Sequence, residues 1–491
     1  MYLGIDIGTS GVKAVVVDDA GEVVDQGTAH LTVDRPHPQW AEQNPDDWWR
    51  GAEAAVAEIK ARAPKALAAV RGAGLSGQQH STTLLDDAER PLRPAILWND
   101  GRSGPQCVEL ERIAPGLRPI TGNQAMPGFT APKLLWVAEH EPEIFAKTRR
   151  ILLPKDYVRL QMTGEAVSDM SDSAGTLWLD VANRKWSGEL LAACGLTEAQ
   201  MPRLVEGSQV SAALKDDVAD RWGVPRGTPV AGGGGDNACG AVGVGVVSTG
   251  RAFLSIGTSG VLFTATPTFA PNPGSGMHAF CHALPGMWHQ MSVIMSAALC
   301  LDWVVKLTGA AGVTALLDEA EAADARGFKD VPVFLPYLMG DRTPHNDPLA
   351  TGVFYGLTPD TDRAALALSV LEGVTFAFVD GMEALTDAGT VIETVSVIGG
   401  GARSAFWGRM LASVLDLTLD YHDGGEVGPA YGAARLARMA ATGEAPETVA
   451  TRPAVARTIH PDAAWADRLA PRLQRYRTLY PTLKPVFHGA E

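Results

Sequence analysis

One six-residue sequence, Ile-Gly-Thr-Ser-Gly-Val, occurs twice in this chain, at residues 7–12 and at residues 256–261. The copies begin about half a chain length apart in a chain of 491 residues. An identity at such a spacing indicates either a duplicated domain or two loops that do matched chemistry. A chain of this length exceeds one ordinary domain, so we expect two α/β domains, covering residues 1–245 and 246–491.

Each copy separates two short apolar runs rich in β-branched residues, which predicts a strand, a tight turn and a second strand. Glycine lets the backbone N–H groups of such a turn face inward, and the Thr and Ser hydroxyls add donors. A concave set of donors is typical of a phosphate site. The candidate phosphate ligands are Gly8, Thr9 and Ser10 in the first copy and Gly257, Thr258 and Ser259 in the second. Two ordinary glycine hairpins are the structural alternative.

Only the first copy carries charges. Asp6 precedes it and can hold a cation, and Lys13 follows it and can attract a phosphate. The second copy has Ser255 and Leu262 at these positions. We therefore expect the first loop to provide the metal ligand.

The acidic composition limits the ligands that this chain can bind. The formal net charge is −15 at pH 7, which argues against binding to nucleic acid or to an anionic membrane. Five scattered cysteines without CxxC spacing favour a reducing cytosol, so we expect a cytoplasmic protein. No run of consecutive apolar residues approaches the length of a membrane span. The sequence leaves open whether the chain forms a homodimer.

Further polar side chains follow glycine turns or strand ends in the first half. The apolar run 70–77 leads into Gln79 and His80, and another strand ends at Asn99. A lone histidine is most often a structural residue, but beside Gln79 at the mouth of a glycine turn we expect His80 to contact a substrate. Trp40, in the Pro-rich loop 36–43, is a weaker ligand candidate, and its alternative is a packed surface residue.

Four consecutive glycines at 232–235 precede Asp236. An apolar strand comes before them and a small-residue helix after them, so we expect a loop that a ligand can approach closely rather than a flexible linker. A carboxylate presented on such a loop has the properties of a general base. The alternative is that Asp236 only caps a helix.

In the second half, the predicted strand 394–398 runs into glycines 399–401 and then a helix. This geometry lets a nucleotide lie against the backbone. Its candidate ligands are Gly400, Gly401, Ala402 and Ser404. We expect helices over 291–308, 313–325 and 362–388. The His and Cys residues between 278 and 289 lack a closed four-ligand pattern, which disfavours a zinc site.

These motifs resemble the FGGY family of carbohydrate kinases, and the similarity covers essentially the whole chain. It is strongest with the members that act on D-xylulose. Among the matching segments are residues 4–10, 77–80, 98–102, 128–140, 235–237, 257–260, 352–357 and 399–402. Ala365 stands where a polar residue is usual.

The resemblance implies two actin-like (ribonuclease-H-like) domains around a central catalytic cleft, with a sugar and ATP as the bound small molecules. By that resemblance, Asp236 is the general base, Asp6 positions Mg²⁺, and the two loops with Lys13 surround the phosphates of ATP. Gln79 and His80, with Asn99 and Trp40 nearby, contact the sugar. The implied activity is ATP-dependent phosphorylation of a ketopentose, at the 5-hydroxyl group if the sugar is D-xylulose.

Two alternatives stay open at this stage. Gln79 stands where some relatives carry Met, and Ser81 replaces a usual glycine, so another substrate of the family (ribulose, gluconate or glycerol) would keep every phosphate motif. A non-enzymatic actin-like ATP-binding protein would also keep the phosphate turns, but it would need no base at Asp236.

Overall fold

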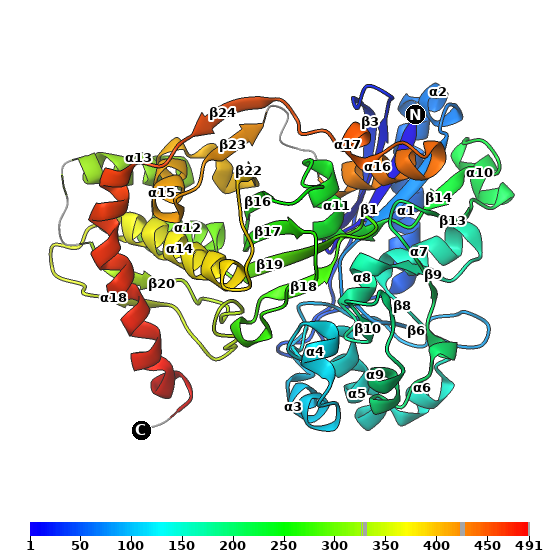
Figure 1. The fold of residues 1–491 in the computed structure, drawn as a ribbon, viewed down its shortest axis with the longest axis horizontal. Coiled ribbons are helices and arrows are strands. Elements are labelled where there is room, and N and C mark those ends of the chain that lie inside the picture. The colour runs from blue at the N-terminus through cyan, green and yellow to red at the C-terminus, as the bar shows by residue number, and fades with distance from the viewer. Residues whose placement is uncertain (326, 328–330, 423–427, 490–491) are drawn as a thin grey trace.

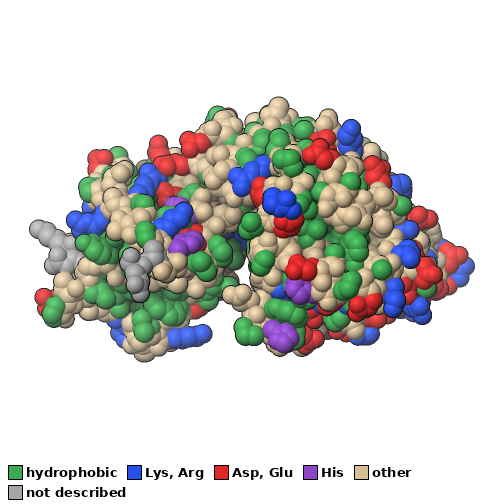
Figure 2. Space-filling view, turned by 90° about the horizontal axis from the view of Figure 1, so that it is seen from below, with side chains coloured by type: hydrophobic (Ala, Val, Ile, Leu, Met, Phe, Trp, Pro, Cys, Tyr) green, Lys and Arg blue, Asp and Glu red, His purple; other side chains and the backbone are tan. Residues whose placement is uncertain are grey.

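The structure, a computed structural model, describes residues 1–325, 327, 331–422 and 428–489. It has two α/β halves, each built on a seven-stranded mixed sheet (Figure 1). The surface is notched between the two halves (Figure 2). The predicted α/β class is therefore confirmed, while the division of the chain at residue 245 stays a prediction.

The first sheet has the strand order β13-β14-β5-β1-β2-β3, and β15 also pairs with β5. β1 lies between an antiparallel hairpin partner, β2, and a parallel neighbour, β5. The strands are β1 (Tyr2–Ile7), β2 (Gly11–Val17), β3 (Val23–His30), β5 (Gly72–Gly77), β13 (Val210–Ala213), β14 (Pro229–Ala231) and β15 (Gly234–Gly235).

The second sheet has the order β18-β19-β17-β16-β22-β23-β24, and its centre repeats the same arrangement. β16 lies between its antiparallel partner β17 and the parallel strand β22. The strands are β16 (Arg251–Ile256), β17 (Gly260–Thr266), β18 (His278–Cys281), β19 (Trp288–Ile294), β22 (Thr394–Ile398), β23 (Leu419–His422) and β24 (Val455–Ile459). The prediction of a helix from residue 291 is wrong, because residues 291–294 continue β19 and the helix begins at Ala298.

Short strand pairs connect these elements: β4 (Glu42–Gln43) with β7 (Ala95–Ile96), β6 (Thr83–Leu85) with β8 (Arg150–Leu152), β9 (Val167–Asp169) with β12 (Arg203–Val205), β10 (Leu179–Asp180) with β11 (Lys185–Trp186), and β20 (Val333–Leu335) with β21 (Val353–Tyr355). The helices of the first half are α1 (Pro45–Arg62), α2 (Pro64–Ala68), α3 (Gly104–Ile113), α4 (Leu117–Thr121), α5 (Thr130–His140), α6 (Pro142–Lys147), α7 (Pro154–Thr163), α8 (Met170–Ala174), α9 (Gly188–Ala193), α10 (Asp216–Trp222) and α11 (Asp236–Gly243). Those of the second half are α12 (Ala298–Thr308), α13 (Val313–Ala325), α14 (Arg363–Thr386), α15 (Ala405–Leu415), α16 (Pro429–Thr442), α17 (Pro446–Val449) and α18 (Ala463–Phe487).

Two helices from opposite ends of the chain cover the two faces of the first sheet. Alternation along β1 places Leu3, Ile5 and Ile7 in a core with α1, because successive side chains of a strand point to opposite faces. The other face meets α16, which comes from the C-terminal part of the chain (Figure 1). Gly4 permits this contact, since a Cβ there would lie 1.9 Å from the carbonyl oxygen of Ala430.

α14 is the longest apolar helix of the core. By length and composition alone it could cross a membrane, and so could α12 and α13 if that bent pair formed one span. However, 83% of the apolar window of α14 is buried inside the fold, against α12, α13, α15 and β20. α14 is therefore buried on nearly every side. All five cysteines are buried and free.

Candidate active site

Asp6 lies at the end of β1, on the face of the sheet opposite the α1 core. Its Oδ1 atom is buried and has no hydrogen-bond partner among the described residues. Burial raises the pKa of Asp6 to about 6, and Ser76 on β5 and Lys13 on β2 act against this rise. A buried carboxylate oxygen without a partner is a hard ligand suited to Mg²⁺. Among the described residues no group of three or more His, Cys, Asp or Glu side chains could hold a metal.

Asp236 is the first residue of α11 and follows the glycine run directly. β15 pairs in parallel with β5, and β5 pairs in parallel with β1, so the sheet brings the ends of these strands to one edge. The Gln79 side chain packs directly against Gly235, since a Cβ at this position would lie 2.6 Å from Nε2 of Gln79. Burial raises the pKa of Asp236 to about 7, and the negative charge of Asp6 adds to the rise. The sheet therefore places the two predicted carboxylates close enough to interact.

One oxygen of Asp236 is held and the other is left for a ligand. Oδ1 accepts hydrogen bonds from the backbone N–H of Asn237 at 2.7 Å and from its Nδ2 at 2.9 Å. The Asp236 side chain does not cap α11, so the alternative reading as a plain helix cap is wrong. A carboxylate with a pKa near 7 and one free oxygen can accept a proton from a hydroxyl group.

His80 and Gln79 follow β5 at the same edge of the sheet. His80 has a left-handed backbone (φ 68°), and its carbonyl oxygen accepts hydrogen bonds from Thr130 Oγ1 and Lys133 Nζ, both at 3.0 Å. Its Nδ1 lies 2.9 Å from the carbonyl oxygen of Gly175, which can only accept, so Nδ1 carries the proton. Burial lowers the pKa of His80 to about 3. The ring is therefore neutral, and Nε2 is left as an acceptor for a hydroxyl group.

The first glycine turn is tied to the rest of its half through Thr9. The Thr9 hydroxyl accepts from Trp98 Nε1 at 2.9 Å and donates to Gln78 Oε1 at 3.3 Å. Its carbonyl oxygen accepts from Gln43 Nε2 at 2.7 Å. The hydroxyl of Thr9 is thus engaged within the protein, and the N–H of Gly8 donates within the turn to the carbonyl oxygen of Gly11 at 3.0 Å. Neither of these two donors is free for a phosphate.

The second glycine turn closes differently from the first. In the first turn Ile7 pairs with Val12, whereas in the second Ile256 pairs with Gly260, so the second loop is one residue shorter. The carbonyl oxygens of Gly257 and Thr258 accept from the N–H groups of residues 298 and 297, at the start of α12. The two copies occupy equivalent strand connections, but they are not conformational copies.

A pocket of about 290 Å³ lies beside the glycine segment that follows β22, at Gly400 and Gly401. The segment is a short 3-10 turn, Gly400–Arg403, and Ser404 then caps α15 by accepting from the N–H of Trp407. Three of the predicted nucleotide ligands, Gly400, Gly401 and Ser404, line this pocket together with residues of α12, α13 and Trp407. Ala402 belongs to the same turn, but its side chain lies outside the described part of the structure.

Asn99 and Trp40, the two remaining sugar candidates, differ in whether their side chains are already engaged by other protein groups. Asn99 has a buried Oδ1 without a partner among the described residues, so it can still receive a hydrogen bond from a ligand. Trp40 stacks against other protein groups: the Arg102 guanidinium lies 3.5 Å from its ring centroid, and the Trp136 ring packs edge-on at 5.3 Å. Arg102 in turn pairs with Asp100 at 2.7 Å. The packed-residue reading of Trp40 therefore has direct structural support.

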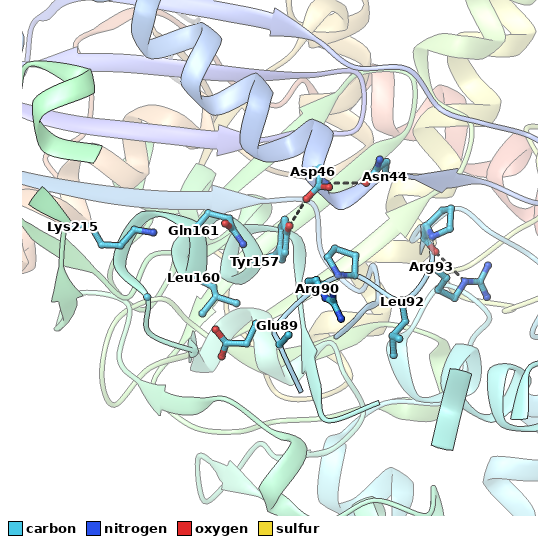
Figure 3. A pocket seen from close by; sticks show the side chains of 14 residues that line it. Asn44, Asp46, Glu89, Arg90, Leu92, Arg93, Tyr157, Leu160, Gln161 and Lys215 are labelled. Atoms are coloured by element: carbon cyan, nitrogen blue, oxygen red, sulfur yellow. Dashed lines mark hydrogen bonds between the residues drawn. The ribbon is translucent and has the colours of Figure 1, made fainter. Parts of the chain in front are cut away.

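A larger pocket, of about 740 Å³, lies elsewhere in the first half (Figure 3). Asp46, which accepts a hydrogen bond from Tyr157, and Lys215 point toward it. None of the predicted site residues is among the described residues that line this pocket. Pocket size alone therefore does not identify the site.

Two groups near the sugar candidates were not anticipated from the sequence. Arg342, from the second half, lies beside Gly128 and His80, and burial lowers its pKa to about 10. Gly175 accepts the hydrogen bond that orients His80. In the sequence, the only signal for Arg342 is a charged residue between Gly340 and Pro344. The backbone carbonyl group of Gly175 has no sequence signal at all.

Both halves of the chain match a known protein family. Residues 1–243 match the N-terminal domain of the FGGY family of carbohydrate kinases, and residues 252–441 match its C-terminal domain. The chain belongs to this family. It is therefore a carbohydrate kinase with the actin-like fold that the motifs implied, and its N-terminal match contains Asp6, His80 and Asp236.

Individual relatives of this FGGY kinase cover it from end to end. It is 52% identical to a xylulose kinase of Escherichia coli, over 99% of this chain and 100% of the relative. A crystal structure described as a xyloylose kinase from Brucella ovis matches with a TM-score of 0.94 and 50% identity, over 99% of each chain. A gluconate kinase from Lactobacillus acidophilus, at 22% identity and a TM-score of 0.92, shares the fold.

Proposed function

We propose that this FGGY kinase phosphorylates D-xylulose with ATP and transfers the γ-phosphate to the 5-hydroxyl group. The observation that carries the proposal is the state of Asp236, which has one oxygen held by Asn237, the other free, and a pKa of about 7 beside Asp6. The relatives that cover the whole chain at 50% identity or more support the choice of sugar.

In the proposed mechanism Asp236 takes the proton from the sugar hydroxyl as that oxygen attacks the γ-phosphate. Phosphoryl transfer needs little covalent work from a protein, so positioning and charge stabilisation supply most of the rate. His80 Nε2 accepts from a sugar hydroxyl and fixes the orientation of the chain of carbons, with Gln79 and Asn99 as further contacts. Gln79 Nε2 and Asn99 Oδ1 are both buried without partners among the described residues, which suits them to pair with hydroxyl groups.

ATP binds, in this proposal, between the two glycine turns and the pocket beside Gly400. The N–H groups of Gly8 and Gly257 close their own turns, so the backbone N–H groups of Thr9, Ser10, Thr258 and Ser259, together with Lys13, hold the phosphates. The adenosine lies in the pocket lined by Gly400, Gly401 and Ser404. Asp6 would hold Mg²⁺, which neutralises charge on the transferred phosphoryl group when it is bound. Closure of the notch between the halves would exclude water, a competing acceptor.

The test is Mg-ATP-dependent ADP release measured with D-xylulose, D-ribulose, L-ribulose, L-xylulose, D-fructose, xylitol, gluconate and glycerol. A clear preference for D-xylulose in kcat/KM is the expected result. Faster turnover of another sugar would keep the kinase mechanism and overturn the substrate. No stimulation by any of them would favour a non-enzymatic ATP-binding protein.

A further inference from the structure

One short helix, α8, contacts both parts of the proposed sugar site. At its beginning, the Ser171 Oγ atom accepts a hydrogen bond from the backbone N–H of Gly235 at 3.2 Å. Just beyond its end, the carbonyl oxygen of Gly175 accepts from His80 Nδ1 at 2.9 Å. Gly235, which precedes the proposed base, is thus held by Ser171, and His80, the proposed sugar ligand, is held by Gly175. The segment 171–175 that provides both contacts is not itself part of the site.

The direction of the hydrogen bonds at Ser171 follows from its partners. Its hydroxyl donates to Asp169 Oδ2 at 2.5 Å, because a carboxylate only accepts. Its lone pairs are then left to accept the N–H of Gly235, which only donates. Asp169 also caps α8 by accepting the N–H of Ser171 at 2.7 Å. The Asp169 carboxylate therefore fixes the backbone and the hydroxyl of Ser171 together.

A buried ionic cluster anchors this arrangement. Lys155 Nζ lies 2.6 Å from Asp156, 2.8 Å from Asp169 and 3.0 Å from Asp172, and all four side chains are fully buried. Removing Lys155 would leave the buried carboxylates without this counter-charge, which is strongly destabilising. Buried ion pairs therefore tie α8 to α7 although α8 is short.

The same cluster reaches the other end of the glycine run. Arg159, on α7 beside Lys155, donates to the carbonyl oxygens of Ala231 at 2.6 Å and Gly232 at 2.5 Å. Glycine has more backbone freedom than any other residue, so four in sequence need external contacts to hold one conformation. Arg159 holds the start of the run, and the N–H groups of Gly232 and Gly233 donate to backbone carbonyl oxygens at 2.8 and 2.9 Å. β15 pairs with β5 at the end of the run, and Ser171 adds the side-chain contact to the N–H of Gly235 there.

We propose that Ser171 is a positioning residue for phosphoryl transfer, which through the N–H of Gly235 sets where the Asp236 carboxylate lies relative to the sugar hydroxyl. This inference rests on the proposed role of Asp236 as the base. Loss of the contact would let the glycine run move, and a displacement of about 1 Å at a reacting group can lower the rate about 10²-fold.

The experiment compares Ser171→Ala with Ser173→Ala. Ser173 lies on the same helix and is equally buried, but its hydroxyl donates to Ser168 at 2.9 Å and accepts no hydrogen bond from the glycine run among the described residues. We expect Ser171→Ala to lower kcat by roughly 10- to 100-fold with little change in KM for ATP, while Ser173→Ala keeps kcat within about threefold. Ser171→Thr, which retains the hydroxyl, should recover most of the rate. Equal kcat in the two alanine variants, or no recovery with threonine, would overturn the proposal.

A second measurement does not depend on the sugar. In the ligand-free protein, hydrogen exchange at the Gly235 amide should accelerate at least roughly tenfold in Ser171→Ala and stay near the wild-type rate in Ser173→Ala. Unchanged exchange at Gly235 would overturn the positioning role even if the wild type proved inactive on every sugar. Faster exchange with an inactive wild type would support the contact and reject the proposed function instead.

Discussion

Asn237 holds one oxygen of Asp236 with two hydrogen bonds, one from its backbone N–H and one from its side-chain amide. Both converge on Oδ1, so the orientation of the carboxylate is set before any ligand binds. The residue that follows the proposed base is therefore its closest support. The first two predictions concern this carboxylate.

Replacing Asp236 with Asn should remove the base and keep the shape of the side chain. An amide oxygen can still accept both hydrogen bonds from Asn237, so we expect the loop to stay in place. We expect kcat to fall by roughly 10²- to 10⁴-fold, the usual contribution of a general base. Titration calorimetry with Mg-ATP should give an affinity close to that of the wild type. Near-normal turnover would remove Asp236 from the mechanism.

The same variant should make the ligand-free protein more stable in a pH-dependent way. The folded pKa of Asp236 is raised from 3.8 to about 7, so the folded state favours the protonated form. The contribution of protonated Asp236 to the stability of the folded state is fully present below about pH 4 and is lost as the pH rises through 7. The gain in unfolding temperature of Asp236→Asn over the wild type should therefore grow from pH 4 to pH 7 and then level off. A pKa shift of this size in a fully buried group would correspond to a larger gain. Asp236 keeps part of its surface exposed, and solvent screens its interactions, so we expect a gain of roughly 1–3 kcal/mol. A gain that shrinks with pH would contradict this account.

His80→Asn should weaken sugar binding selectively. Asn tolerates the left-handed backbone of residue 80 but cannot place an acceptor where Nε2 lies. We expect the sugar KM to rise by roughly 10- to 100-fold, with little change in KM for ATP. His140→Asn is the matched control, because His140 Nδ1 also meets a backbone carbonyl oxygen, that of Trp136 one turn earlier in α5. A larger rise in the KM for ATP than in the KM for the sugar would show that the sugar does not bind at His80. Gln79→Ala should give the same pattern of KM changes as His80→Asn.

Filling the pocket beside Gly400 should impair ATP binding. Leu317 lines this pocket, so Leu317→Trp would occupy space that we assign to adenosine. We expect KM for ATP to rise by roughly tenfold or more and the sugar KM to stay unchanged. Leu307→Trp serves as the control, because Leu307 is 58% exposed on α12. An unaltered KM for ATP in Leu317→Trp would place the adenosine elsewhere.

Gly432→Ala should destabilise the first half of the molecule through a helix from the second. A Cβ at Gly432 would lie 1.7 Å from the carbonyl oxygen of Cys239, so α16 and α11 would have to separate. Overpacking of this kind costs about 1–3 kcal/mol, and we expect a fall in unfolding temperature of roughly 4–10 °C. Gly104→Ala is the control, since a Cβ at Gly104 meets nothing within 4 Å. Equal unfolding temperatures for the two variants would show that the contact relaxes at no cost.

Local chemistry was sufficient to predict many elements from the sequence. The predicted helix 313–325 agrees with α13, and the predicted helix 362–388 corresponds to α14, which Asp362 caps. The strand 394–398 agrees with β22 residue by residue. These elements follow from caps, β-branched runs and glycine turns, which act over a few residues and can be read without the fold.

The candidate site was predictable only where its residues stand at the ends of strands. Asp6 and Asp236 are far apart in sequence, but Asp6 lies near the end of β1 and Asp236 directly follows β15. Both strands pair in parallel with β5, and parallel strands end at one edge. Their closeness is a consequence of sheet order. The support from α8 was not predictable, because a hydroxyl group and a backbone carbonyl carry no distinctive pattern.

The repeat itself separates what the sequence determined from what only the tertiary structure decided. Six identical residues specify a glycine turn between two strands in both halves, because glycine and β-branched residues have the same local preferences everywhere. The register of each turn differs, with Ile7 opposite Val12 in one half and Ile256 opposite Gly260 in the other. In the second half the start of α12 binds the loop carbonyls, and in the first Gln43 and Trp98 hold Thr9. Hydrogen bonds from distant segments, absent from the hexapeptide, therefore select the register.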